Sequence, residues 1–196
     1  MNRKIFAELV SHCHNDVSKV DHEFIHRTFE VKLEKRYEHL VDYANAIDDQ
    51  CLNRYFSTYW HADMKKWKHS GLSLIDEVNN LRPRAVLDVG CGYNEFKGKI
   101  NNLIGIDPYN DNADLKVGPM EYKTENKFDV ILCLGSVNFG GRNKIIAEVS
   151  KCVNMLADGG TIFFRVNPGI QHDRPEARWI EFFSWNVPFI IELAEI

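Results

Sequence analysis

Two glycines follow a short apolar run in the middle of the chain, within residues 86–92 (VLDVGCG). We expect the apolar run to form a strand and the glycines to form a loop that leads into a helix. Glycines at a strand end let the backbone turn sharply and let a ligand approach closely. The N–H groups at the start of a helix attract a polar or anionic ligand group. Alone, this pattern also fits an ordinary tight turn, so the neighbouring residues carry the argument.

Two acidic residues accompany this loop. Asp88 lies within the expected strand, where an unpaired carboxylate is costly to bury. It therefore requires N–H donors or a cationic ligand. Asp107 directly follows a second apolar run, residues 103–106 (LIGI). A carboxylate at the tip of the second strand of such a sheet can accept both hydroxyls of a ribose.

The residue at the third position of the loop distinguishes two classes of nucleotide. Dinucleotide-binding loops carry a glycine there, which permits close packing around a pyrophosphate. This chain has Glu95 instead, and its carboxylate would repel a pyrophosphate. The site therefore favours a nucleoside without phosphates, such as S-adenosylmethionine, whose ammonium and sulfonium suit Asp88. A nicotinamide-dependent oxidoreductase is disfavoured by Glu95 and by the short interval from Gly92 to Asp107.

The pattern of apolar residues after Pro83 predicts the sheet that holds these residues. Near-continuous apolar runs separated by crossovers are typical of a parallel sheet with helices on both faces. Helices are predicted over residues 143–156 and, because proline suits a first helical position, over 188–196. The predicted strands cover residues 85–89, 103–106, a weak 114–117, 128–134 and 161–166.

The first 80 residues contain almost no glycine and are predicted to be helical. The three- and four-residue spacing of apolar side chains over residues 20–46 predicts one amphipathic helix. Ser70 can cap a further helix over residues 71–81, which Pro83 ends. We therefore expect a helical N-terminal cap, residues 1–82, and a ligand-binding α/β domain, residues 83–196.

Four segments in this order resemble the class I, Rossmann-like S-adenosylmethionine-dependent methyltransferase family: VLDVGCG, LIGIDP, FDVILCLGSVNF and LADGGTIFFRVN. The resemblance covers residues 85–166. It implies a Rossmann-like α/β sheet with helices on both faces, S-adenosyl-L-methionine as cofactor, and transfer of its methyl group. The family's sheet carries two further strands after a helix like the one predicted at 188–196, and we expect this C-terminal hairpin to be missing here.

The resemblance also implies roles for individual residues. The family usually has an acidic or amide residue that meets the adenine; Met120 stands in that region, and we expect it to pack on the ring. The other implied cofactor residues line the methionine moiety (Asp88, Gly90, Cys91, Gly92), the ribose (Asp107), the adenine (Pro108) and the methyl donor (Leu134, Gly135).

The acceptor is expected beyond the carboxyl ends of the later strands, where open α/β sheets hold their ligand crevice. Methyl transfer mainly requires a nucleophile held within ~3–3.5 Å of the methyl carbon, and no catalytic base is identified, although His172 could supply one. Tyr59 and Trp60 could wall the site as part of a lid, or the aromatic segment could pack the cap. The other candidate acceptor residues are Ser136, Asn138, Arg165 and Asn167.

The charge composition limits the kinds of binding partner that we expect. With 24 basic and 28 acidic residues the net charge is -4, which provides no strong field for nucleic acid or an anionic membrane. A small-molecule acceptor is therefore expected. Single-stranded nucleic acid stays an alternative, because Arg54 and Lys65, Lys66 and Lys68 interleave with aromatic residues.

The cysteines indicate the cellular compartment of the protein, and the histidines indicate whether it binds a metal ion. Five dispersed cysteines favour free thiols in a reducing cytoplasm, and no apolar run reaches the ~18 residues of a membrane span. The spacing of the N-terminal histidines matches no familiar zinc site, so no metal is expected. The leading hypothesis is a cytoplasmic methyltransferase acting on a small molecule. Its alternative is a non-catalytic S-adenosylmethionine-binding or regulatory protein.

Overall fold

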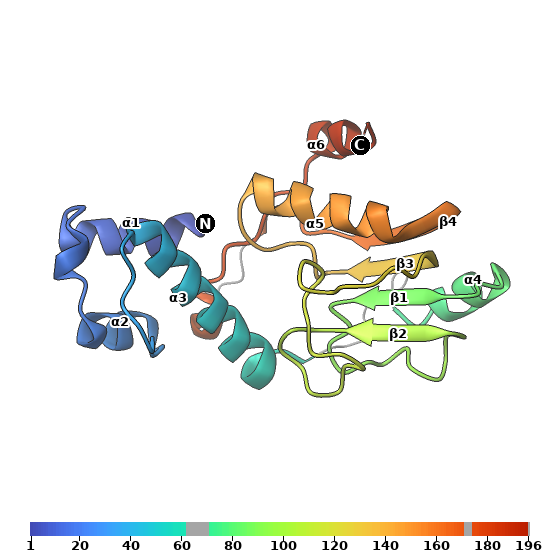
Figure 1. The fold of residues 1–196 in the computed structure, drawn as a ribbon, viewed down its shortest axis with the longest axis horizontal. Helices are drawn as coiled ribbons and strands as arrows, with labels where there is room; N and C mark the ends of the chain where they lie inside the picture. Colours follow the sequence, from blue (N-terminus) through green and yellow to red (C-terminus); the bar gives the residue numbers. More distant parts are fainter. Residues whose placement is uncertain (62–70, 171–173, 196) are drawn as a thin grey trace. The chain divides into compact units, whose positions relative to one another are not determined.

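The computed structural model describes residues 1–61, 71–170 and 174–195, which form two compact units (Figure 1). The first unit comprises Met1–Trp60, Phe139–Gly141 and Ile170–Phe182. The second comprises His61–Asn138, Arg142–Gly169 and Phe183–Ile196. These units differ from the division expected between residues 82 and 83, because two later segments pack with the N-terminal helices.

The first unit is built on three helices: α1 (Arg3–Cys13), α2 (His22–Phe29) and α3 (Leu40–Arg54), which continues into a π-helical segment, Tyr55–Tyr59. The starts of α1 and α2 are defined by side-chain caps. The Asn2 side chain accepts the N–H groups of Lys4 and Ile5, and the Asp21 side chain accepts that of Phe24. Short 3-10 segments cover Val17–Lys19 and Pro175–Ala177.

The single helix predicted over residues 20–46 is wrong, since two helices separated by an irregular segment stand there. α2 ends at Phe29, and Glu30 takes a left-handed conformation with φ of 56°. At this end, the Arg54 guanidinium from α3 donates to both the carbonyl and the carboxylate of Glu30. The irregular segment still buries Val31. Helical spacing alone therefore could not reveal the break, because both arrangements bury apolar residues in the same core.

The second unit contains a parallel sheet of four strands: β1 (Val86–Val89), β2 (Leu103–Ile106), β3 (Phe128–Leu134) and β4 (Leu156–Arg165). The strand order is β2-β1-β3-β4, and every pair is parallel. The carboxyl ends of the strands therefore meet at one edge, where Asp88 is paired with both Gly105 and Leu132. The predicted α/β fold is confirmed.

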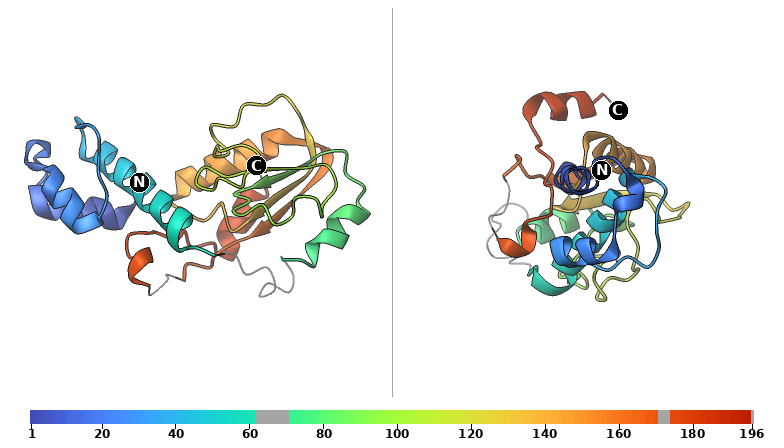
Figure 2. Two further views of the ribbon diagram at one scale, coloured as in Figure 1. Left: turned by 90° about the horizontal axis from the view of Figure 1, so that it is seen from below. Right: turned by 90° about the vertical axis from the view of Figure 1, so that its left-hand side faces the viewer.

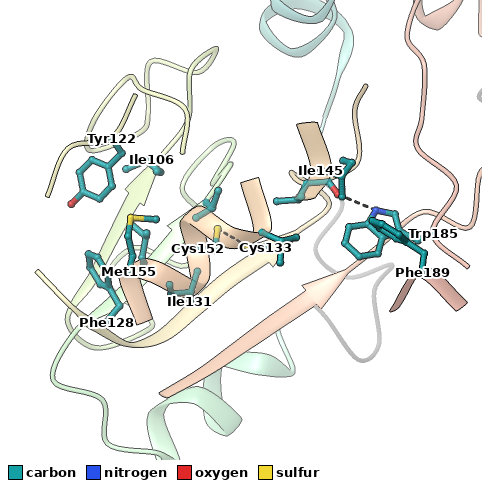
Figure 3. Packing of buried hydrophobic residues seen from close by; sticks show 14 residues of the cluster. Ile106, Tyr122, Phe128, Ile131, Cys133, Ile145, Cys152, Met155, Trp185 and Phe189 are labelled. Carbon is teal, nitrogen blue, oxygen red and sulfur yellow. Dashed lines mark hydrogen bonds between the residues drawn. The ribbon is translucent and has the colours of Figure 1, made fainter. Parts of the chain in front are cut away.

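Helices cover both faces of this sheet. On one face, α5 (Arg142–Met155) packs against Leu87, Ile131 and Cys133, and Phe189 of α6 (Val187–Leu193) belongs to the same apolar cluster. On the other, α4 (Leu74–Asn80) packs through Val78 against Val86. Figure 2 shows α4 and α5 on opposite sides of the strands. Figure 3 shows the α5 face, with Trp185 and Phe189 together at one end of the cluster.

Two predicted elements beside the site are absent from the described residues. The weak strand at 114–117 is reduced to one parallel bridge between Leu115 and Ile106, because the Asp114 carboxylate accepts the Gly105 N–H at 2.8 Å and the Lys97 ammonium at 2.9 Å. The glycine loop leads into turns instead of a helix. Asn94 and Gly98 in these turns have φ of 58° and 75°, which a right-handed helix does not allow.

The remaining predicted helices are present with small shifts. α5 covers residues 142–155 where 143–156 was predicted, and α6 covers 187–193 where 188–196 was predicted. α4 is shorter than predicted, and Ser70, its expected cap, lies outside the described residues. Among the helices that the structure describes, none combines the length and the apolar character needed to cross a membrane.

Candidate functional site

The glycine loop and the loop after β3 lie against each other at the carboxyl edge of the sheet. Gly90 has φ of 69° and Gly92 has φ of 55°, so both take the left-handed conformation that favours glycine. A Cβ atom on Gly90 would lie 2.3 Å from the Cβ of Ser136. Gly90 therefore has two physical reasons to be glycine, and one of them is contact with a predicted acceptor residue.

Asp107 joins the tip of β2 to the glycine loop. Its Oδ1 accepts the N–H groups of Tyr109 at 2.8 Å and Asn110 at 2.9 Å, and its Oδ2 accepts that of Gly92 at 3.0 Å. Burial raises the pKa of Asp107, and these three N–H donors oppose the rise. An ionised carboxylate offers about four acceptor positions. The three backbone bonds therefore leave Oδ2 able to accept one more donor.

Asp88 is a buried carboxylate one strand away, 3% exposed. Burial, together with the negative charge of Asp107, raises the pKa of Asp88 to about 7, and the positive charge of Arg165 opposes the rise. Asp88 is therefore partly protonated near neutral pH. A cation placed beside it would favour the ionised form.

Arg165 ends β4 opposite Leu134 of β3. Its Nη2 donates to the carbonyl of Leu134, and a Cβ on Gly135 would lie 3.0 Å from the same nitrogen. The guanidinium therefore extends across the tip of β3. Burial lowers the pKa of Arg165 and the charge of Asp88 opposes that change, so the two residues interact electrostatically.

The loop after β3 is held in place by residues from two other segments. The Asn138 side chain accepts the N–H of Asn167 at 2.9 Å and lies 3.5 Å from the Arg165 carbonyl. The Trp185 indole donates to the carbonyl of Val137 at 3.1 Å, and a dashed line at Trp185 marks this bond in Figure 3. The polar atoms of the Asn138 side chain thus bond to backbone, and this residue positions the loop.

Ser136 differs from Asn138 in having an unused polar atom. Its Oγ is buried, and it has no hydrogen-bond partner among the described residues. A buried hydroxyl without a partner is unusual in a folded protein, because it has lost water without gaining a bond. The Ser136 hydroxyl, which lies beside Gly90, is therefore available to a ligand.

The other predicted residues are distributed more widely. Leu134, Gly135 and Cys91 are half-buried at the same edge, whereas Pro108 is exposed after β2 and Met120 is 48% exposed. Tyr59 and Trp60 belong to the first unit, so their part in the site stays a prediction. His172 and the three lysines at 65, 66 and 68 lie outside the described residues.

The sequence did not point to two residues that the structure places at or near this edge. Trp185 fixes the loop after β3, as described above. Tyr93 follows Gly92 directly, and its hydroxyl lies 3.1 Å from Nδ1 of His61, with the two rings stacked at an interplanar angle of 11°. Tyr93 adjoins the glycine motif without being one of its spaced residues, whereas Trp185 is distant in sequence and only the fold brings it to this loop.

The comparisons with known proteins identify solved structures of similar fold. No protein-family model matches the sequence, and no curated protein matches it significantly. One similar structure is the 1,6-didemethyltoxoflavin-N1-methyltransferase of Burkholderia thailandensis, with bound 1,6-didemethyltoxoflavin and S-adenosylhomocysteine. The identity is 14%, the TM-score is 0.55, and the match covers 83% of this chain and 80% of that one.

Two further structures are similar. A protein from Pyrococcus horikoshii OT3 is 14% identical with a TM-score of 0.50, over 72% of this chain and 85% of that one. The N-methyltransferase NodS from Bradyrhizobium japonicum WM9, in complex with S-adenosylhomocysteine, is 16% identical with a TM-score of 0.44, over 67% and 83%. The chain thus has the Rossmann-like fold of the class I S-adenosylmethionine-dependent methyltransferases.

Proposed function

We propose that this protein binds S-adenosylmethionine and transfers its methyl group to a small-molecule acceptor. The observation that carries the proposal is the meeting of the left-handed glycine loop, Asp88 and Asp107 at the carboxyl edge of one parallel sheet. In open α/β sheets this edge holds the ligand. The fold likeness to a methyltransferase whose structure contains a small-molecule acceptor and S-adenosylhomocysteine supports the same function.

The residues present fit this cofactor. Asp107 keeps an acceptor position for a ribose hydroxyl, Asp88 suits the ammonium, and the unpartnered Ser136 hydroxyl offers a further hydrogen bond. The left-handed glycines permit close approach of the backbone. When bound, the cofactor supplies an electrophilic methyl group. The protein's own task is to hold and orient the two reactants, since positioning accounts for most of such a reaction.

A second candidate function has one observation in its favour. The Arg165 guanidinium lies against Gly135, which the family resemblance places beside the methyl donor. A cation there repels a sulfonium but not the uncharged thioether of S-adenosylhomocysteine. A protein that binds the demethylated product without turnover would have this preference.

Calorimetry and methyl transfer separate these functions. The purified protein is titrated with S-adenosylmethionine, S-adenosylhomocysteine and NAD, and then incubated with methyl-labelled cofactor and a cell extract. Methyltransferase activity predicts binding of the first two ligands and label in the small-molecule fraction. Binding of NAD without S-adenosylmethionine contradicts the proposal, and binding with no label in any fraction favours the second candidate.

The variant Asp107→Asn links binding to the site. We expect its affinity for S-adenosylhomocysteine to fall at least about tenfold, because the amide replaces one carboxylate oxygen with a donor that cannot accept a ribose hydroxyl. The matched control is Asp111→Asn, which removes an exposed carboxylate that pairs with Lys116 in the loop after β2. If the two variants bind S-adenosylhomocysteine equally well, Asp107 does not contact the cofactor.

A further inference from the structure

A short segment before α6, residues 183–185, bonds to both of the loops that follow β3 and β4. Phe183 donates its N–H to the Asn138 carbonyl at 2.8 Å, and Trp185 donates its N–H to the Asn167 carbonyl at 3.0 Å. The Asn167 N–H in turn donates to Oδ1 of Asn138 at 2.9 Å. The three segments are therefore joined by a closed ring of hydrogen bonds at the carboxyl edge of the sheet.

A glycine lets this segment approach the loop after β4 closely. Gly169 has φ of 98°, and a Cβ on it would lie 2.7 Å from the Cβ of Ser184. The Ser184 hydroxyl donates to the Pro168 carbonyl at 3.0 Å, and the same two residues form an antiparallel bridge. Residues 183–185 and the loop after β4 are therefore in direct contact.

The Trp185 side chain connects this segment to the loop after β3. Trp185 is 7% exposed, and its ring centroid lies 5.9 Å from that of Phe183 and 5.3 Å from that of Phe189. Its indole N–H donates to the carbonyl of Val137, the residue after Ser136. Because other aromatic rings enclose the indole, its N–H keeps one direction, and the bond determines where Val137 lies.

Ser136 is the residue whose position depends most on this bond. Its Oγ is buried and has no partner among the residues that the structure describes, and its Cβ lies against Gly90 of the glycine loop. Residues 136–138 belong to no strand or helix, so no backbone ladder holds them. The bonds from Trp185 and its neighbours therefore take the place of a ladder, and they keep the Ser136 hydroxyl beside the glycine loop.

We propose that Trp185 is a positioning residue for methyl transfer: its indole N–H holds the loop after β3 so that the Ser136 hydroxyl stays aligned with the reactants. This inference rests on the proposed function, and Trp185 lies outside the segments that resemble the methyltransferase family. Transfer depends on alignment more steeply than binding does. A misplacement of about 1 Å can lower a rate about 100-fold, whereas one neutral hydrogen bond changes an affinity only by a few fold.

Trp185→Phe in the full chain tests this role, because it keeps an aromatic ring in the cluster and removes the N–H donor. Calorimetry measures its affinity for S-adenosylhomocysteine. The initial rate of label transfer from methyl-labelled S-adenosylmethionine into the small-molecule fraction of a cell extract is measured at saturating cofactor. We expect the rate to fall roughly 10- to 100-fold and the affinity to fall by less than about threefold.

Trp179→Phe is the matched control. Trp179 belongs to the first unit and is 9% exposed, and its indole N–H donates to the Thr28 carbonyl at 3.1 Å, the same distance as in the bond to Val137. Its substitution removes an equivalent bond outside the ring described above. We expect the two tryptophan variants to lose similar stability in urea, and Trp179→Phe to transfer label within about twofold of the unmodified rate.

The variant Ser136→Ala shows whether Trp185 acts through Ser136. We expect it to transfer label slowly as well, and the double variant Trp185→Phe with Ser136→Ala to be no slower than Ser136→Ala alone. Two residues that act through one position do not have additive effects, whereas independent residues do.

Four results would overturn the positioning role. These are an unmodified transfer rate in Trp185→Phe, an equal loss of rate in the two tryptophan variants, and additive losses in the double variant. The fourth is an equal loss of affinity and rate in Trp185→Phe, because the bond would then serve cofactor binding. If the unmodified protein transfers no label, the proposed function itself fails, and this inference with it.

Discussion

Gly90 and Gly98 have the same backbone conformation in different surroundings. Gly90 has φ of 69° and Gly98 has φ of 75°. A Cβ on Gly90 would clash with Ser136, whereas one on Gly98 would meet nothing within 4 Å. The two positions therefore separate the cost of the left-handed conformation from the cost of the contact.

We expect Gly98→Ala to lower the free energy of unfolding by about 1–2 kcal/mol, the cost of the left-handed conformation for alanine. Gly90→Ala should cost about 1–3 kcal/mol more, because the clash forces the two loops apart. Urea unfolding of both variants measures the difference. Equal destabilisation would mean that the loops are not packed as the structure shows.

Asp88 predicts how cofactor affinity depends on pH. Its pKa is raised to about 7, and an ammonium binds the ionised form. The affinity for S-adenosylhomocysteine should therefore rise between about pH 6 and 8, while that for 5′-methylthioadenosine, which lacks the amino acid group, stays constant. Calorimetry at several pH values measures this, and Asp88→Asn should abolish the dependence. A parallel change for both ligands would assign the effect to another group.

Individual site residues were predictable from the sequence where a charged side chain stands in an apolar segment, which is rare. A carboxylate inside an apolar strand, such as Asp88, and a carboxylate at the next strand's tip, such as Asp107, stand out because burial of charge is costly. Trp185 was not predictable. An aromatic residue near a helix start is ordinary, and its bond to Val137 depends on a turn of the chain that no spacing encodes.

At the scale of elements, α5 carries a buried acid on its packed side. Glu148 is 8% exposed, and burial raises its pKa to about 7, helped by Glu121 and opposed by Lys144. In the folded state the group keeps its proton up to about pH 7, whereas in the unfolded state it loses it near 4.5. Its contribution to stability is therefore present below about pH 4.5 and lost as the pH rises to about 7.

We expect Glu148→Gln to remove the loss of folding stability that accompanies ionisation of Glu148. Relative to the unmodified protein, the variant gains stability as the pH rises, by about 3 kcal/mol once the pH exceeds 7. Urea unfolding at pH 5 and pH 8 measures the gain. A constant difference between the two proteins at both pH values would show that Glu148 is not buried as described.

β1, β2 and β3 were predicted well because each is a short, mainly apolar run that is largely buried, whereas β4 is partly exposed and begins at Leu156, before the predicted residue 161. β2 and β3 have the predicted bounds. The elements next to them were not predictable, since interactions distant in sequence decided them. Arg54 stabilises the end of α2 from the far end of α3, and the Asp114 carboxylate accepts the Gly105 N–H of β2, beside a single backbone bridge.

At the scale of the whole molecule, Asn2 connects three parts of the first unit. Its amide nitrogen donates to Asp48 at 2.8 Å and to the Trp179 carbonyl at 2.7 Å, while its oxygen accepts the N–H groups of Lys4 and Ile5 at the start of α1. Asn2 is completely buried. The hydrogen bonds of one side chain therefore connect α1, α3 and the segment that contains Trp179.

Asn2→Ala should lower the free energy of unfolding by about 2–4 kcal/mol, since it removes a helix cap and leaves buried groups without this partner. Hydrogen exchange should accelerate in α1 and at the Trp179 indole, which donates to the Thr28 carbonyl. The control is Asp16→Ala, an exposed cap of Ser18, with a loss below about 1 kcal/mol. Equal losses would show that the buried connection contributes nothing.

The route of the chain through its two units has a consequence for biosynthesis. Trp179 completes the core around α1, α2 and α3, yet it is made long after them. At 5–20 residues per second, the three helices wait on the order of ten seconds for this side chain. The helices that leave the ribosome first are thus among the last to finish folding, and during this interval their apolar faces are open to chaperones.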